Sequence, residues 1–152
     1  MVNPIPEDYP RVTTYLCVDG AAEAIDYYTS VLGFTERRRM VFGGKVGHCE
    51  LVLGDSMIML SDEFPEMGAV GPKTLGGTPT SMNVYVEDSD AVHAAALEAG
   101  ATELRPVEDQ FYGDRSGQFE DPWGHRWGVA TFVEDVDDDE LDRRAAEMMG
   151  EG

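Results

Sequence analysis

The sequence contains one pattern twice, and this repeat constrains the fold more than any other feature. An alternating stretch at residues 15–19 leads into a segment of helical periodicity, residues 21–32. About 68 residues later, residues 83–87 lead into a second such segment, residues 91–99. The repeat is too long for a small solenoid unit, and two copies are too few for an array. We therefore expect a duplicated half-domain whose two copies build one cavity between them.

Each half is predicted to run strand, helix and then three strands. In the first half the predicted elements are a strand at 13–18, a helix at 21–32, and strands at 34–42, 48–53 and 56–60. In the second half they are a strand at 81–86, a helix at 89–99, and strands at 102–107, 118–121 and 125–132. Gly43-Gly44 predicts a hairpin turn, and Gly33 a left-handed cap at the end of the first helix. Residues 108–117 are predicted to form a polar loop.

These elements predict an α+β fold of two tandem βαβββ modules, which form a curved mixed sheet around a cleft. The whole chain, 1–152, is expected to be a single domain, with halves at about 11–62 and 80–133, a linker at 63–79 and an acidic tail at 134–152. The tail opens with seven acids in nine residues, and Leu141, Ala145 and Met148 follow at helical spacing. We expect a short helix there that docks on the body or on a second subunit, with the surface of Arg37 to Arg39 as a plausible receiver.

Composition places the chain among globular proteins. At 152 residues and 42% hydrophobic it can bury a sizeable core. No apolar run reaches the roughly 18 residues that a membrane-spanning helix needs. Residues 1–10 lack a signal-peptide pattern, so a cytoplasmic location is expected. Cys17 and Cys49 both fall in predicted strands, where two reduced thiols are favoured over the disulfide that is also possible.

The net charge of −19 is extreme for this length. A strongly acidic surface repels nucleic acids and anionic membranes, so neither is an expected partner. The charge suits a salt-rich cytoplasm, where screening relieves self-repulsion. It equally suits an ordinary acidic protein with an acidic tail, and composition does not separate these two interpretations.

Two motifs carry a resemblance to a known family. Residues 19–34 read D-G-x-x-x-x-I-D-Y-Y-x-x-V-L-G-F, and residues 120–127 read E-D-P-W-G-H-R-W. Together with the repeat, they resemble the vicinal oxygen chelate superfamily, which includes glyoxalase I, extradiol dioxygenases and bleomycin-resistance proteins. Residues 54–62 and 111–117 are similar to its PhnB-like branch. The resemblance covers roughly residues 11–135 and implies the fold. It does not imply one activity, because members of the superfamily carry out many reactions on the same scaffold.

The resemblance also implies where a metal would bind. Metal-dependent members place one ligand on the first and last strand of each half, and these positions correspond to Thr13, Met59, Ser81 and Gly128. Such residues are poor ligands for a hard divalent cation, which prefers carboxylate or imidazole. We therefore expect no metal and no other cofactor, which disfavours glyoxalase I and dioxygenase activity. A homodimer is expected from the resemblance, because superfamily clefts are often completed across a two-fold axis.

His48 and Glu50 are the candidate catalytic residues. They lie two apart on a predicted strand and so face the same side of the sheet. If that side is the cavity, they can act as a base and its partner or as ligands of an unconventional metal site. The alternative is that they lie on the outer face, against a helix or a dimer partner.

The segment Tyr112 to Arg115 is the densest polar cluster. An arginine presented from a glycine-flanked loop can bind a carboxylate or phosphonate bidentately, which makes Arg115 a candidate ligand clamp. Alternatively, Arg115 pairs with Asp114, Glu120 or Asp121 and only holds the shape of the loop.

Alternating hydroxyl and amide side chains complete the candidate site. Ser81, Asn83 and Tyr85 share one face of a predicted strand, as Thr13 and Tyr15 do in the other half. Trp123 can stack on a flat ligand, whereas core packing is favoured for Trp127. The predicted ligand-binding residues are Thr13, Tyr15, Met59, Ser81, Asn83, Tyr112, Arg115 and Trp123.

Two functions of different classes remain open. The first is a metal-free protein that binds and sequesters a small-molecule ligand, a cationic or aromatic drug or metabolite, as the resemblance to bleomycin-resistance proteins implies. The second is a glyoxalase-like lyase or isomerase acting on a small oxygenated metabolite, through His48 and Glu50 or an atypical metal. The unsuitable residues at the four metal positions favour the binding protein. The His48/Glu50 pair is the observation that supports the lyase or isomerase.

Overall fold

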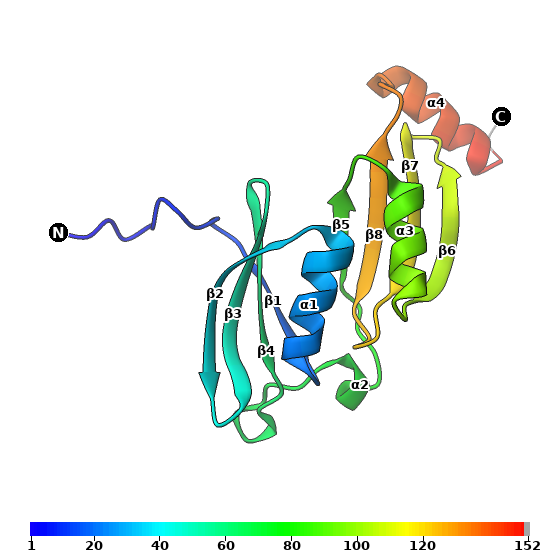
Figure 1. The fold of residues 1–152 in the computed structure, drawn as a ribbon. Coiled ribbons are helices and arrows are strands. Elements are labelled where there is room, and N and C mark those ends of the chain that lie inside the picture. Colours follow the sequence, from blue (N-terminus) through cyan, green and yellow to red (C-terminus); the bar gives the residue numbers. More distant parts are fainter. Residues whose placement is uncertain (151–152) are drawn as a thin grey trace. The chain divides into compact units, whose positions relative to one another are not determined.

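A computed structural model describes residues 1–150 of the protein (Figure 1). The chain divides into two compact units, unit 1 (Met1–Thr78) and unit 2 (Pro79–Gly152). Each unit is described by itself. Residues 151–152, the end of the predicted tail, lie outside the described residues.

Unit 1 contains one four-stranded mixed sheet. Its elements are β1 (Thr14–Val18), α1 (Ala21–Leu32), β2 (Thr35–Phe42), β3 (Lys45–Leu53), β4 (Ser56–Asp62), the short 3-10 helix η1 (Pro65–Met67) and α2 (Pro72–Leu75). The strand order is β1-β4-β3-β2, with β1 parallel to β4 and the other neighbours antiparallel. The helix α1 packs against one face of this sheet and leaves the opposite face uncovered by the helix (Figure 1).

The helix α1 forms where its apolar spacing predicts it. Ile25, Tyr28 and Leu32 recur at helical spacing and are all buried. The helix begins after Gly20, where the Asp62 carboxylate accepts the amides of Gly20 and Ala21 at 3.1 and 2.8 Å. Asp62 thus ties the start of α1 to the end of β4 and orients the helix on the sheet.

Three glycines, at two places in unit 1, adopt the left-handed backbone. Gly33 ends α1 with φ 83°, and its amide bonds to the Tyr28 carbonyl. Gly43 and Gly44 have φ of 57° and 80°, so they form the tight turn between β2 and β3. Both predictions from the sequence are confirmed.

The linker after β4 is structured within unit 1. The Glu63 carboxylate accepts the amide of Gly71 at 2.7 Å, and Phe64 pairs with Ala69. A side chain at Gly71 would collide with the carbonyl oxygen of Cys17, so glycine permits the close approach of the linker to β1. Residues 63–78 therefore pack on their own module.

Unit 2 repeats the arrangement. Its elements are β5 (Ser81–Tyr85), α3 (Ser89–Glu98), β6 (Thr102–Asp109), β7 (Asp114–Glu120), β8 (Arg126–Phe132) and α4 (Asp138–Met148). The strand order β5-β8-β7-β6 matches that of unit 1, with β5 parallel to β8. The predicted α+β fold of two βαβββ modules is confirmed, and α4 is an addition to the second (Figure 1).

The polar loop predicted at residues 108–117 is wrong. Strand β6 continues to Asp109 and β7 begins at Asp114, so only a four-residue turn separates them. Strand β7 pairs with β8 along its whole length. The side chains of β7 on the face away from α3 are polar. The sequence of β7 therefore lacks the apolar alternation that indicates a strand.

The core of unit 2 lies between its sheet and α3. Phe119, Trp127 and Val129 are 0%, 1% and 0% exposed. Asp121 accepts the indole N–H of Trp127 at 2.9 Å and the amides of Trp123 and His125, each at 2.9 Å. This buried carboxylate therefore holds the β7–β8 turn, and Trp127 takes the packing role that was favoured for it.

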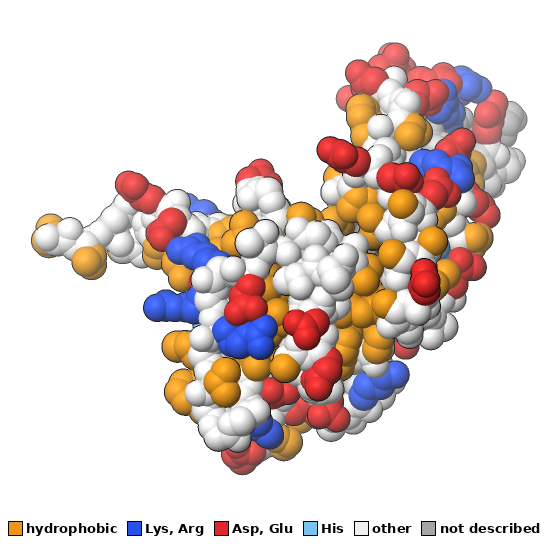
Figure 2. Space-filling model, in the orientation of Figure 1, with side chains coloured by type: hydrophobic (Ala, Val, Ile, Leu, Met, Phe, Trp, Pro, Cys, Tyr) orange, Lys and Arg blue, Asp and Glu red, His pale blue; other side chains and the backbone are white. Residues whose placement is uncertain are grey.

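Acidic side chains gather over the end of unit 2 that carries α4 (Figure 2). Asp137 caps the helix by accepting the amide of Glu140 at 2.9 Å, and three acids occupy its first turn. None of the helices among residues 1–150 is long and apolar enough to span a membrane.

Candidate functional site

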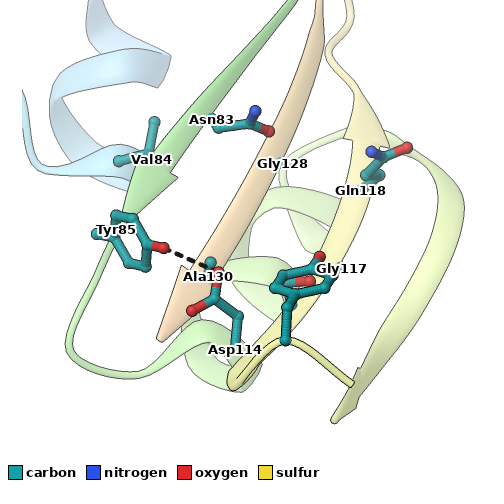
Figure 3. A pocket seen from close by; sticks show the side chains of 10 residues that line it. Asn83, Val84, Tyr85, Asp114, Gly117, Gln118, Gly128 and Ala130 are labelled. Carbon is teal, nitrogen blue, oxygen red and sulfur yellow. Dashed lines mark hydrogen bonds between the residues drawn. The ribbon is translucent and has the colours of Figure 1, made fainter. Parts of the chain in front are cut away.

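A pocket of about 270 Å³ lies in unit 2, on the sheet face turned away from α3 (Figure 3). Three neighbouring strands, β5, β8 and β7, and the turn before β7 supply its walls. The lining residues are Asn83, Val84, Tyr85, Tyr112, Asp114, Ser116, Gly117, Gln118, Gly128 and Ala130. The pocket therefore combines aromatic, amide, hydroxyl and carboxylate groups.

The floor of the pocket is set by strand register. Asn83, Gly128 and Gln118 are direct cross-strand partners on β5, β8 and β7. A side chain at Gly128 would collide with the amide oxygen of Asn83. Because the middle strand carries no side chain here, the amide of Asn83 extends over Gly128, and Gln118 projects from the strand on the other side (Figure 3). Such amides can donate and accept hydrogen bonds to an oxygen- or nitrogen-bearing ligand.

Asp114 supplies a carboxylate inside the pocket. It is 8% exposed, and it accepts a hydrogen bond from the hydroxyl of Tyr85 at 2.9 Å (Figure 3). The hydrogen bond to Asp114, together with partial burial, raises the pKa of Tyr85, so the phenol remains a donor at neutral pH. A carboxylate in so little water favours a positively charged partner.

The turn before β7 brings a second aromatic ring to the pocket. Tyr112 lines it, and its ring meets that of Phe111 edge-on, with 5.2 Å between centroids. The turn is closed by two backbone hydrogen bonds, in which the amide of Gly113 donates to the carbonyl of Gln110 and the amide of Gln110 donates to the carbonyl of Asp114. Tyr85 and Tyr112 therefore offer two π faces within reach of one carboxylate.

Unit 1 places a different constellation on its equivalent face. His48 Nε2 lies 2.9 Å from Glu50 Oε2, and His48 Nδ1 lies 2.9 Å from the hydroxyl of Tyr15. Tyr9, from the N-terminal segment, donates to both carboxylate oxygens of Glu50 at 3.1 Å. Cys49 and Leu51, which alternate with this pair, are fully buried on the α1 side. His48 and Glu50 therefore face away from the helix.

Glu50 is a buried carboxylate with several donors. Its side chain is 4% exposed, and the guanidinium of Arg37 lies 3.7 Å away. Burial by itself raises the pKa of Glu50, but hydrogen bonds from His48 and Tyr9 and the charge of Arg37 outweigh it, so the pKa is lowered. Glu50 is consequently ionised at neutral pH and only accepts hydrogen bonds, which assigns the proton on His48 to Nε2.

Tyr15 forms the outer end of this network. Burial raises the pKa of its phenol, so at neutral pH the hydroxyl is protonated. With Nε2 of His48 donating to Glu50, a neutral imidazole leaves Nδ1 to accept from Tyr15. Carboxylate, imidazole and hydroxyl thus stand in the order that general acid–base sites use.

The predicted site residues fall into separate groups. Asn83 and Tyr112 line the pocket of unit 2, and Tyr15 joins the His48/Glu50 network of unit 1. Met59 is the cross-strand partner of both Tyr15 and Glu50, so it lies at the centre of the same face. The rest of the set lies elsewhere, with Thr13 just before β1, Ser81 at the start of β5 and Trp123 in the turn held by Asp121.

Arg115 lies on the α3 side of β7 and not among the lining residues. Its guanidinium binds Asp90 on α3 at 2.7 and 3.0 Å and Asp109 on β6 at 3.1 Å. These hydrogen bonds raise its pKa further above the ordinary arginine value. Its partners are thus not the three acids weighed from the sequence, because residue 115 points to the opposite face from residue 114.

Several pocket residues were missed. The sequence predicts Tyr85 as one of the alternating polar side chains of the site, but it places Asp114 and Ser116 in a loop and Gln118 at the start of a strand. Their signal is the polar alternation at positions 114, 116 and 118, which marks one face of a strand. That pattern becomes informative only once the stretch is known to be paired with β8.

The donor chemistry at the four family metal positions is poor in the structure too. Thr13 and Ser81 offer only hydroxyls, Met59 a thioether and Gly128 no side chain, which does not suit a hard divalent cation. Across residues 1–150, no group of three or more His, Cys, Asp or Glu side chains is arranged to hold a metal ion. The residues present do not fit the metal that the family implies.

Comparison with known proteins identifies the family. Residues 10–129 match the Glyoxalase/Bleomycin resistance protein/Dioxygenase superfamily, and the chain belongs to it. The protein Mb0911c of Mycobacterium bovis is 38% identical over 147 residues, which cover 94% of this chain and 96% of that protein. The predicted superfamily is thereby confirmed.

Solved structures show the same fold. Protein PA1353 from Pseudomonas aeruginosa superimposes with a TM-score of 0.69 at 25% identity, covering 82% of this chain and 99% of that one. The PhnB protein from Bacillus cereus superimposes with a TM-score of 0.65 at 20% identity, over 80% of this chain and 99% of that one. The predicted resemblance to PhnB-like proteins is therefore confirmed at the level of the fold.

Proposed function

We propose that this protein binds a small organic cation with an aromatic ring, without a metal, in the pocket of unit 2. One observation carries the proposal: a pocket of about 270 Å³ brings a nearly buried carboxylate, Asp114, together with the rings of Tyr85 and Tyr112. A carboxylate and π faces both attract cations, and aromatic rings also stack on a flat ligand.

The amides of Asn83 and Gln118 add orientation to this attraction. They lie at the pocket floor, on the two strands that pair with β8 at Gly128, where they can bond polar atoms at the far end of a ligand. The net charge of −19 attracts cations over a longer range and speeds their encounter with the protein. Drug or metabolite sequestration, which the resemblance implies for the superfamily, is consistent with this chemistry.

The experiment uses benzamidinium as the probe and neutral benzamide as its isosteric control. Titration followed by NMR should shift the side-chain amides of Asn83 and Gln118 and the backbone amide of Gly128. We expect Asp114→Asn to weaken benzamidinium binding about tenfold, as the loss of one charged contact does, and to leave benzamide unaffected. Glu98→Gln, which removes an exposed charge of the same unit on α3, is the matched control.

Two results would contradict the proposal. Equal affinity for benzamidinium and benzamide would show that the Asp114 carboxylate does not contribute to binding. Shifts that cluster away from the pocket, with equal binding by Asp114→Asn and Glu98→Gln, would show that only the overall charge attracts the cation.

A second candidate is acid–base catalysis on unit 1, and the Tyr15–His48–Glu50 network favours it. If the Tyr15 hydroxyl turns to a substrate carbonyl oxygen, His48 Nδ1 is left to take a proton from the adjacent carbon. The C–H pair becomes the C=C bond of an enolate, and the carbonyl π pair moves to oxygen. Glu50 then stabilises the imidazolium. In an α-hydroxy carbonyl substrate, the hydroxyl proton moves to the enolate oxygen, the released O–H pair forms the new C=O bond, and the C=C pair takes the proton back from His48 at the former carbonyl carbon, which completes an isomerisation.

Deuterium exchange tests this candidate. Hydroxyacetone in D₂O, followed by proton NMR, should lose its carbon-bound protons faster with the protein than without it. We expect His48→Gln to remove the acceleration and Tyr9→Phe to retain most of it, because loss of the Tyr9 hydroxyl leaves the hydrogen bond between Glu50 and His48 in place. Identical rates for the native protein and His48→Gln would exclude His48 as the base.

A further inference from the structure

The turn that carries Tyr112 is held from outside by the C-terminal segment. Both Val133 and Glu134 donate their backbone amides to the carbonyl of Gly113, at 2.9 and 3.0 Å. This contact follows directly after β8, where the chain leaves the sheet toward α4. The turn at 110–113 is thus bonded to β7 on one side and to the start of the tail on the other.

Gly113 permits this approach. Its φ of 101° lies in the left-handed region, and a Cβ there would collide with the carbonyl oxygen of Glu134. No other residue type fits both conditions without displacing the tail or the turn. Glycine is therefore required at position 113 as long as the tail is docked against the turn.

Arg144 closes the arrangement from α4. Its guanidinium donates to the carbonyl of Phe111 at 3.0 Å, to Glu140 at 2.9 Å and to the carboxylate of Glu134. One side chain therefore connects three points: the turn next to Tyr112, the segment that leaves β8, and the helix itself. A planar guanidinium with five N–H donors can serve all three at once.

We propose that Arg144 is a positioning residue for the pocket, and that the C-terminal segment, residues 133–148, clamps the turn 110–113 so that Tyr112 stands at the pocket wall. The inference rests on the proposed binding function, because it states how one wall of that site is kept in place. Without the clamp, the turn loses its bonds to Glu134 and Arg144, and ligand binding must order Tyr112 at an entropic cost.

The neighbouring arginine offers a matched control. Among residues 1–150, Arg143 pairs only within α4, with Glu140 and Glu147 at 2.7 Å each. Its removal perturbs the helix and its ion pairs to a similar extent, yet it touches no residue of the turn. A difference between the two arginines therefore isolates the contact with the turn from helix stability.

The clamp should depend on salt. The side chains of Arg144 and Glu134 are 28% and 48% exposed, so dissolved ions screen their attraction. The carbonyl of Phe111 and the amides bonded to Gly113 are not charged and respond less. Raising the salt concentration should loosen the turn in the native protein and have little further effect once Arg144 is replaced.

The experiment compares Arg144→Ala with Arg143→Ala in the full chain. We expect Arg144→Ala to weaken benzamidinium binding about fivefold, the equivalent of one partly exposed charged contact, and Arg143→Ala to leave it unchanged. Amide hydrogen exchange of Val133 and Glu134 should speed up only in Arg144→Ala, and the NMR signals of Tyr112 should shift only there. Arg144→Lys, which keeps the charge but not the fork, should fall between the two.

The outcomes separate this inference from the proposed function. If the native protein binds benzamidinium and both alanine variants bind it equally well, with equal exchange at Val133 and Glu134, the clamp is refuted. If the native protein binds no benzamidinium, the proposed function fails, while exchange and the Tyr112 signals still decide whether Arg144 holds the turn.

Discussion

The sheets of the two units have the same strand order but carry different side chains at equivalent positions. In unit 1 the cross-strand row at the centre of the free face is Tyr15, Met59 and Glu50, whereas in unit 2 it is Asn83, Gly128 and Gln118. Unit 1 fills its middle strand with a methionine and buries a carboxylate under Tyr9. Unit 2 leaves the middle strand bare, and a pocket results.

The middle-strand position of this row carries a thioether side chain in unit 1, Met59, and no side chain in unit 2, Gly128. The backbone pairing is the same in both units, so the difference resides in side-chain volume and in which residues cover the row. Unit 1 carries fixed hydrogen-bonding chemistry, whereas unit 2 carries space for a ligand. A duplicated module can therefore keep its fold and divide its roles.

The largest expected effect comes from making unit 2 resemble unit 1. Gly128→Met places at the pocket floor the side chain that Met59 places in unit 1, and it should lower benzamidinium affinity on the order of 100-fold by occupying the space. The circular dichroism of the variant should remain native, which separates filling from unfolding. Met59→Gly is the reverse change and should leave binding in unit 2 intact. Undiminished binding by Gly128→Met would place the ligand elsewhere.

The next effect concerns the buried carboxylate of unit 1. Glu50→Ala leaves His48, Tyr9 and Arg37 without their common acceptor, and it should lower the free energy of unfolding by about 2 to 3 kcal/mol. The equivalent change in unit 2, Gln118→Ala, should cost less than about 1 kcal/mol, because Gln118 is only half-buried at the rim of a pocket. Urea unfolding measures both. Similar losses for the two variants would show that the faces do not differ as described.

A smaller effect is expected from Arg115. Its partners Asp90 and Asp109 are exposed, so Arg115→Ala should lower the melting temperature only slightly. Benzamidinium affinity should not change, because the side chain lies on the α3 side of β7. Calorimetric titration and thermal unfolding together test this. A loss of affinity at constant stability would support the ligand clamp that the sequence predicts for Arg115.

The smallest effect is a pH dependence of the tail. Hydrogen bonds from Arg143 and Arg144 lower the pKa of Glu140 to about 2, below its ordinary value of about 4.3. A carboxylate with a lowered folded-state pKa stabilises the fold above its unfolded pKa, and this contribution fades as pH falls through the folded value. The contacts of α4 should therefore persist at pH 4 and weaken toward pH 2. Carbon-13 NMR of the Glu140 carboxyl follows the titration, and an ordinary midpoint would contradict it.

Much of the fold could be predicted because its signals are local. The spacing of Ile25, Tyr28 and Leu32 predicts α1, and Gly33 and Gly43-Gly44 mark the places where the backbone must turn left-handed. The repeat then predicts the second module from the first. Asn83 and Tyr112 were reached in the same way, from alternation along a strand and from a polar cluster.

The rest of the candidate site was decided by pairing across the sheet. Asp114, Ser116 and Gln118 become one wall only because β7 pairs with β8, and Arg115 turns toward Asp90 because neighbouring strand residues face opposite sides. Gly128 matters because Asn83 and Gln118 flank it, and Gly113 because Glu134 passes close by. The sequence by itself thus determined the elements and their order, since periodicity and turn chemistry act between near neighbours. Only the tertiary structure decided which side chains share a pocket, because register joins residues that are far apart in the chain.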